Sequence, residues 1–283
     1  MELFLIPINP IDVFLWTFRK NEKDVVNLYN TLSPVMQIAT GGSMLNFGYW
    51  SKEHSDPISA QENLCNVFGN LSELSTAKNV VDVGSGLSAP SKLWRDSYPT
   101  LNLYDVNINF KQLSFLKHEK NIEFLNSTST KLPFTNNSVD RVLALESAQH
   151  FKPLDNFISE SKRVLIKSGF LVMAVPITLK NSSLGRLGLL KFTWSSEHYG
   201  LDYLRDLISS NGFKIIDETL IGNHVYDPLA DYYVENRKLL SEKILKQYPA
   251  YMEKILYKSL LKMKKASEEK IIDYVLLKCA LDD

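Results

Sequence analysis

The sequence has few cysteines, no excess of charge and few long apolar runs. Its 283 residues include 2 cysteines and 5 histidines, and neither type recurs at a spacing typical of metal ligands. We therefore expect no metal site and no disulfide framework, and a reducing cytoplasm is the expected compartment. The 32 basic and 32 acidic residues cancel, which gives no support to a nucleic-acid-binding function.

One apolar segment, residues 1–20, raises the question of a targeting sequence. Glu2 stands where a signal peptide would carry basic residues, and Pro7 and Pro10 interrupt the run. No other segment approaches the roughly 20 apolar residues that span a bilayer. We predict that residues 1–20 form a packed arm or an oligomer contact, and a membrane-touching helix is the alternative.

A glycine turn is the most informative feature that is present. The apolar run Val80–Val83 predicts a buried strand, Gly84 and Gly86 follow it, and a helical pattern begins at Ser88. Glycine allows a sharp turn and the close approach of a ligand. A helix N-terminus beside such a turn presents backbone N–H groups and a positive dipole end to one point. The segment predicts a ligand site, although a glycine pair alone would fit any strand-to-helix turn.

Strands and helices alternate through the middle of the chain. We predict strands at 79–83, 101–106, 122–125, 141–145 and 169–176, and helices at 21–38, 56–74, 88–98, 109–118 and 153–166. Asp56 before Pro57 is a favourable helix start, with an N-cap carboxylate and proline at the first helical position. Such alternation predicts a parallel sheet with helices on both faces, whose strands end along one ligand-binding edge.

The last third of the chain has a different character. A helix at 195–210 and a strand at 212–220 precede a helical insertion at 229–269, which is broken at Tyr248-Pro249, and a final strand at 271–278. Apolar and basic residues of the insertion fall on separate helical faces: Tyr248, Met252, Ile255, Leu256, Leu260 and Met263 on one, and Lys254, Lys258, Lys262 and Lys265 on the other. We interpret them as a core-facing stripe and a solvated face. The alternatives are a lid over an apolar acceptor, or a basic surface for acidic lipid or an acidic carrier domain.

Further motifs follow the predicted strands in order. They are Asp105-Val-Asn107 with Gln112, Leu132-Pro-Phe134, Glu146 with His150, and Arg163-Val-Leu-Ile-Lys-Ser-Gly169. In this order they resemble the class I S-adenosylmethionine-dependent methyltransferases of the small-molecule type. The pattern is similar to sugar and macrolide O-methyltransferases and, more distantly, to cyclopropane-fatty-acid synthases. The resemblance covers about residues 40–225, with a terminal strand at 272–277.

The resemblance implies an α/β fold with a Rossmann-like, seven-stranded, mostly parallel sheet. It also implies a helical arm and cofactor-covering loop at 1–50, a core at 51–227, a helical lid inserted at 228–269 and a last strand at 270–283. The implied cofactor is S-adenosylmethionine, and the implied partner is a small-molecule acceptor.

Cofactor contacts are likewise implied by the resemblance. Gly84, Ser85 and Gly86 would line the methionine part, and Asp82 would hold the turn or the amino group. Asn107 with Gln112 would bind the ribose, with Asp105 as a competing ligand. Thr128 and Ser129 would lie near the adenine, and Tyr49 belongs to a loop that would close over the cofactor. Glu146 would contact the cofactor or the acceptor.

Three positions depart from the family pattern. Ser88 replaces a glycine, Asn107 replaces the ribose-binding acid, and Thr128 replaces the acid near the adenine. Charge-assisted hydrogen bonds are typically about twice as strong as neutral ones. The departures therefore weaken the expected hold on the cofactor without changing the expected fold.

The chemistry assigns roles to His150 and Glu146. Methyl transfer from a sulfonium needs alignment and exclusion of water, and a hydroxyl acceptor must also lose its proton. We predict His150 as that base and Glu146 as its support, with residues 178–200 and 228–269 as the acceptor lid. Predicted substrate contacts are Gln149, Trp194, His224 and Tyr226, with His198 as a further candidate.

The function predicted is O-methylation of a sugar, polyketide or other secondary metabolite. Carbon methylation of a lipid or isoprenoid acceptor remains an alternative, because the Asn107/Gln112 pair and the apolar arm fit it too. A cofactor-binding scaffold that no longer turns over is a third possibility.

Overall fold

The computed structural model describes Ile11, residues 21–179 and residues 199–282. The predicted arm at residues 1–20, Ile11 apart, lies outside the described residues. So do Trp194, His198 and most of the segment predicted as the first part of the acceptor lid.

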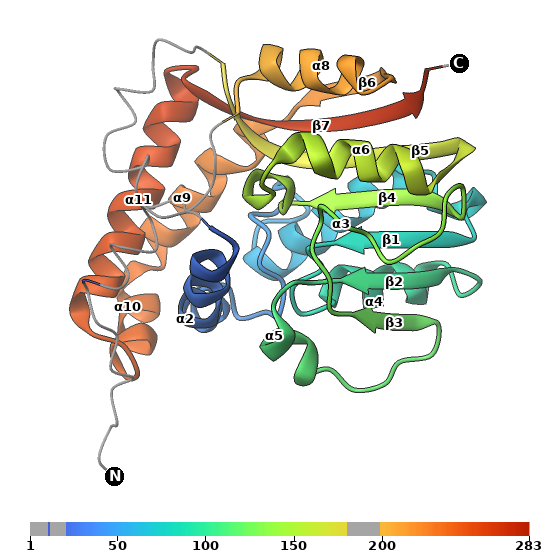
Figure 1. The fold of residues 1–283 in the computed structure, drawn as a ribbon. Coiled ribbons are helices and arrows are strands. Elements are labelled where there is room, and N and C mark those ends of the chain that lie inside the picture. Colours follow the sequence, from blue (N-terminus) through green and yellow to red (C-terminus); the bar gives the residue numbers. More distant parts are fainter. Residues whose placement is uncertain (1–10, 12–20, 180–198, 283) are drawn as a thin grey trace.

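Seven strands form one sheet in the order β3-β2-β1-β4-β5-β7-β6 (Figure 1). Strands β1 to β5 are parallel, whereas β7 runs antiparallel to both of its neighbours, β5 and β6. The predicted seven-stranded, mostly parallel sheet is confirmed. Its strands are β1 (Asn79–Val83), β2 (Asn102–Val106), β3 (Ile122–Leu125), β4 (Val139–Leu145), β5 (Leu165–Thr178), β6 (Phe213–Leu220) and β7 (Ile272–Leu281).

Helices cover both faces of the sheet because successive strand residues point to opposite sides. Val80 packs into a core with α3 (Pro57–Leu71) and α4 (Ala89–Ser97). Its neighbour Val81 packs into the opposite core with α6 (Leu154–Val164) and α8 (Leu201–Ser210). The remaining short elements are α5 (Phe110–Ser114), η1 (Leu74–Thr76), η2 (Ala148–His150) and η4 (Gly222–His224).

Local sequence rules set several element boundaries. The Asp56 side chain accepts hydrogen bonds from the Ile58 and Ser59 amides at the start of α3, so the predicted helix start is confirmed. The helix predicted at 109–118 is only the five residues of α5, because the chain turns out of the helix at Phe115. β5 begins at Leu165, earlier than predicted.

Three helices fill the insertion between β6 and β7. They are α9 (Tyr226–Glu235), α10 (Arg237–Leu245) and α11 (Ala250–Glu268). The predicted break at Tyr248-Pro249 is confirmed, and a second break at Asn236 separates α9 from α10. Most of the predicted apolar stripe is buried, but Ile255 is 40% exposed, so its assignment to that stripe is wrong. The side chain of Ile255 is exposed to solvent, as are those of Lys254 and Lys258 on the same helix.

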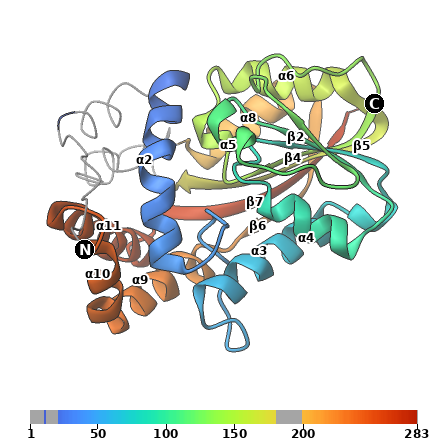
Figure 2. The same ribbon diagram turned by 90° about the horizontal axis from the view of Figure 1, so that it is seen from below.

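The insertion packs against α2 (Glu22–Thr40), the helix that precedes the sheet. Val35 of α2 belongs to one apolar cluster with Ile244, Tyr248 and Met252 of the insertion. Both views place α2 between the α10–α11 pair and the sheet (Figures 1 and 2). The insertion therefore supports α2 from behind.

Among the described segments, none of the helices is long and apolar enough to cross a membrane.

The packing of α10 on α2 predicts how substitutions in α10 change the free energy of unfolding. Ile244 is fully buried, so Ile244→Ala should lower the free energy of unfolding by about 2–5 kcal/mol through the cavity it leaves. The adjacent Leu245 is 43% exposed, and Leu245→Ala should change that free energy by less than about 0.5 kcal/mol. Urea unfolding followed by circular dichroism measures both. Equal losses in the two variants would contradict this packing.

Candidate functional site

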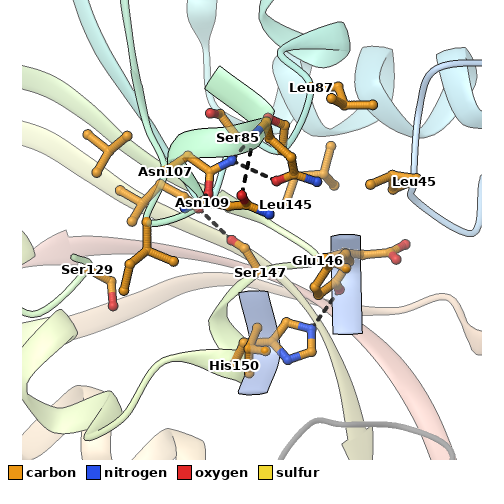
Figure 3. A pocket seen from close by; sticks show the side chains of 18 of the residues that line it. Leu45, Ser85, Leu87, Asn107, Asn109, Ser129, Leu145, Glu146, Ser147 and His150 are labelled. Carbon is orange, nitrogen blue, oxygen red and sulfur yellow. Dashed lines mark hydrogen bonds between the residues drawn. The ribbon is translucent and has the colours of Figure 1, made fainter. Parts of the chain in front are cut away.

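A pocket of about 140 Å³ lies at the carboxyl edge of the sheet. Its lining comes from α2, from residues 43–46 and from the segments that follow β1, β2, β3 and β4. In open parallel sheets, ligands bind at this edge. Figure 3 shows Glu146 and His150 on one side of the pocket, and Asn107, Asn109 and Ser129 from the other strand ends.

The glycine turn forms one wall of the pocket. Gly84 has a φ of 80°, and a Cβ there would lie 2.5 Å from the Cβ of Ser147. The Ser147 hydroxyl donates to the Val83 carbonyl at 2.6 Å, which fixes the end of β4 against the turn. Only glycine fits position 84, because both the backbone angle and the close contact exclude a side chain.

Two serines of the turn bear on ligand binding. Ser88, which replaces a family glycine, itself adopts a left-handed φ of 62°. The turn therefore keeps its shape at this departure. The Ser85 hydroxyl lines the pocket and is buried, and no described residue hydrogen-bonds to it. A buried hydroxyl of this kind is suited to bind a polar ligand group.

Asn107 and Gln112, the residues predicted to bind the ribose, lie in the pocket wall, and their side chains hydrogen-bond to each other. The side-chain amide of Asn107 donates to Gln112 Oε1 and to the Gly86 carbonyl, both at 3.0 Å. Asn107 Oδ1 accepts from the backbone N–H of Asn109 at 2.9 Å, and Asn109 Oδ1 accepts from the backbone N–H of Gln112 at 3.3 Å. These side chains hold the shape of the β2 end.

Helix α2 crosses the pocket and is tied to the segments after three different strands. The ties are hydrogen bonds between Glu22 and Thr128 (2.7 Å), Asn30 and Asn109 (3.0 Å), and Tyr29 and His150 (2.8 Å). The sequence analysis missed Glu22 and Tyr29 as pocket residues. The partners are 79 to 121 residues apart in sequence, so no local pattern could reveal them.

Glu146 joins three parts of the chain at the end of β4. Its Oε1 accepts hydrogen bonds from the Phe47 amide at 2.8 Å and from the Tyr274 hydroxyl of β7 at 3.0 Å. Burial nevertheless raises the pKa of the Glu146 carboxyl to about 8, although both hydrogen bonds act to lower it. The carboxyl is therefore largely protonated at neutral pH.

Asp105, predicted as a competing ribose ligand, does not line the pocket. Asp105 and Asp82 are neighbours in the β1–β2 pairing, both are buried, and neither lines the pocket. The Ser91 hydroxyl contacts both carboxyls, at 2.5 Å for Asp105 and 3.4 Å for Asp82. Burial raises the pKa of Asp105 to about 6, and burial together with Asp105 raises that of Asp82. The Asp82 and Asp105 carboxyls are thus joined through Ser91, near the start of α4.

Four further predicted contact residues, Tyr49, Gln149, His224 and Tyr226, lie outside the pocket lining. Tyr49 stacks on His224 with ring centroids 4.8 Å apart, so residues 43–46 rather than Tyr49 cover the pocket. The Gln149 amide donates to the Glu146 carbonyl at 2.7 Å. The buried Tyr226 hydroxyl donates to the Asp273 carbonyl at 3.2 Å.

The helical lid at 228–269 stays a prediction. None of its residues lines the main pocket, because α2 stands between the insertion and the strand ends. In the part of the chain that the structure covers, no group of three or more His, Cys, Asp or Glu side chains could hold a metal ion.

Comparison with known proteins gives one domain match. Residues 81–173 match the family model of a methyltransferase domain. The chain is also similar to erythromycin 3''-O-methyltransferase from Saccharopolyspora erythraea, at 24% identity over 254 residues, which covers 82% of this chain and 81% of that protein.

Solved structures share the fold at low identity. The cyclopropane synthase MmaA2 from Mycobacterium tuberculosis aligns with a TM-score of 0.74 and 14% identity, covering 89% of this chain and 95% of that one. The [4+2]-cyclase SpnF aligns with a TM-score of 0.73 and 16% identity, covering 92% and 96%. One of these neighbours is named as a cyclopropane synthase and the other as a [4+2]-cyclase. The shared fold therefore does not determine which reaction a protein catalyses.

The raised pKa of Glu146 makes a prediction about stability and pH. A carboxyl whose pKa rises on folding, here from 4.5 to about 8, contributes stability that is complete below the unfolded value and is lost as pH rises through the folded one. The free energy of unfolding of the parent protein, minus that of Glu146→Gln, should therefore fall between about pH 5 and about pH 8. Urea unfolding at several pH values measures this difference. Parallel profiles would contradict the assignment.

The family match begins at Val81, in the strand that carries the glycine turn, and ends in β5 beyond Glu146 and His150. It thus spans the strand ends that build the pocket. We conclude that the chain contains a methyltransferase domain and is an S-adenosylmethionine-dependent methyltransferase, with S-adenosylmethionine as its cofactor.

Proposed function

We propose that the protein methylates a hydroxyl group of a sugar, a polyketide or a similar secondary metabolite, with His150 as the general base. The observation that carries this proposal is the place of His150 in the pocket wall, directly after β4, with its Nε2 2.8 Å from a hydroxyl group, that of Tyr29. The similarity to erythromycin 3''-O-methyltransferase supports the same reaction class.

The pocket supplies alignment and a cover. Bound S-adenosylmethionine provides a methyl group already activated by the sulfonium. Ser85 and the Gly84–Gly86 backbone are placed to hold its amino-acid part beside the N-terminus of α4. Helix α2 and residues 43–46 close over the pocket, which limits the access of water to the reacting groups.

His150 provides a place for the acceptor's proton. Imidazole is the side chain best suited to exchange a proton near neutral pH. The Tyr29 hydroxyl marks a position from which an acceptor hydroxyl would reach Nε2. An acceptor hydroxyl in that position would give its proton to His150 as its oxygen attacks the methyl carbon.

Glu146 supports the same site. Because the pKa of its carboxyl is raised to about 8, the group is mostly uncharged at pH 7. An uncharged wall fits a neutral hydroxyl acceptor better than a cationic amine. Glu146 also lies on the segment that carries His150, so its bonds to Phe47 and Tyr274 steady both.

Replacement of the base tests the proposal. His150→Ala should lower the rate of methyl transfer to a hydroxyl acceptor by about 10²–10⁴-fold, because the proton then has no positioned base. Cofactor affinity should fall by less than about tenfold, since the proposed role of His150 is toward the acceptor and not toward the cofactor. Transfer of a labelled methyl group to a panel of macrolides and glycosides gives the rate, and calorimetry with S-adenosylmethionine gives the affinity.

A matched control is His118→Ala, because His118 is exposed and does not line the pocket. It should leave both the rate and the affinity unchanged. An undiminished rate in His150→Ala would remove His150 as the base. Cofactor binding without transfer to any acceptor would favour the scaffold.

A further inference from the structure

We propose that Glu22, on the first turn of α2, binds the adenine amino group of S-adenosylmethionine. The proposal takes the cofactor as given and is independent of the acceptor. The neutral residues Asn107 and Thr128 stand at the ends of β2 and β3, so the question is which group in this pocket supplies a carboxylate to the nucleoside.

Glu22 and Glu146 carry the two side-chain carboxyl groups that line the pocket among the described residues. Glu146 follows β4, whereas Glu22 meets the segment after β3. Strands β1 and β2 lie between these two in the sheet order. The two carboxyls therefore serve different parts of a ligand that crosses the strand ends.

The side-chain oxygens at the β2 end are neutral amide oxygens, and each is already engaged by a neighbouring residue. The side-chain oxygens of Asn107, Asn109 and Gln112 each accept a hydrogen bond from another member of the same group. In open α/β folds the ribose lies at the end of the second strand. A base attached to that ribose can extend past β2 toward β3, where Thr128 and Glu22 meet.

The Glu22 carboxylate is placed to accept a hydrogen bond at that position. Its Oε1 accepts from the Thr128 hydroxyl at 2.7 Å, which orients the group. Its Oε2 has no hydrogen-bond partner among the described residues. A carboxylate only accepts hydrogen bonds, whereas the adenine amino group only donates them. The Glu22 carboxylate therefore complements the adenine amino group, and a hydrogen bond to an ionised acceptor is stronger than one to a neutral acceptor.

This assignment gives α2 a direct part in cofactor recognition. The helix is held against the insertion by Val35, Ile244 and Met252, and that packing brings Glu22 to the β3 end. The carboxylate thus comes from the helix that covers the pocket, rather than from the strand ends that form its floor.

The test compares two ligands that differ at the amino group. S-Adenosylhomocysteine carries it, and S-inosylhomocysteine has an oxo group in its place, which would face the carboxylate with a second acceptor. Calorimetry should show that the parent protein prefers the adenosyl ligand by about tenfold or more. Glu22→Gln should bind that ligand about tenfold more weakly and should reduce the preference to below about threefold.

Two variants separate recognition from a structural effect. Glu62→Gln removes an exposed carboxylate of α3 that does not line the pocket, and it should keep the parent's affinity and preference. Adding Thr128→Asp to Glu22→Ala places a carboxylate on the β3 side, and it should restore the preference.

The proposal is overturned if Glu22→Gln keeps the parent's preference between the two ligands, even if it binds both more weakly. Such a uniform loss would mean that Glu22 only stabilises the helix start. No acceptor is present in this assay, so its outcome does not depend on whether the proposed hydroxyl methylation is correct.

Discussion

The pocket depends on the position of α2, which is held between two unlike surfaces. On one side, Val35 packs with Ile244, Tyr248 and Met252 of the insertion. On the other, three hydrogen bonds join the helix to the segments after β2, β3 and β4. A single hydrogen bond contributes about 1 kcal/mol net, whereas a buried aliphatic side chain contributes about 1.5–3 kcal/mol. Apolar packing therefore places the helix, and the hydrogen bonds set which residues face the pocket.

Much of the fold follows from local sequence rules. The mostly parallel sheet could be anticipated because apolar runs alternate with helical patterns, and Asp56-Pro57 starts a helix where the capping rules predict one. The glycine turn was equally readable, since Gly84 has a positive φ and no room for a side chain. These features depend on a few neighbouring residues, which is why the sequence alone reveals them.

The side chains around the pocket were harder to anticipate. Asp105 stands at a strand end, as a ribose ligand would, yet it has the same parity in β2 as the core residue Leu103 and so points beneath α4. Strand alternation could have revealed this. The surroundings of Tyr226 and His224 were hidden for another reason: their partners, Asp273 and Tyr49, are distant in sequence, and a long-range contact leaves no local pattern. The same limit hid Glu22 and Tyr29.

The place of β7 has a consequence for how the molecule is made. This strand enters the sheet between β5 and β6, both of which precede it in the chain, and its Tyr274 bonds to Glu146. During synthesis, neither β5 nor β6 can pair with β7 until β7 has left the ribosome. The Glu146 carboxyl gains its Tyr274 donor only at that moment. A growing chain thus cannot assemble the complete pocket early, and a chain cut short before residue 272 would leave two unpaired strand edges exposed to aggregation.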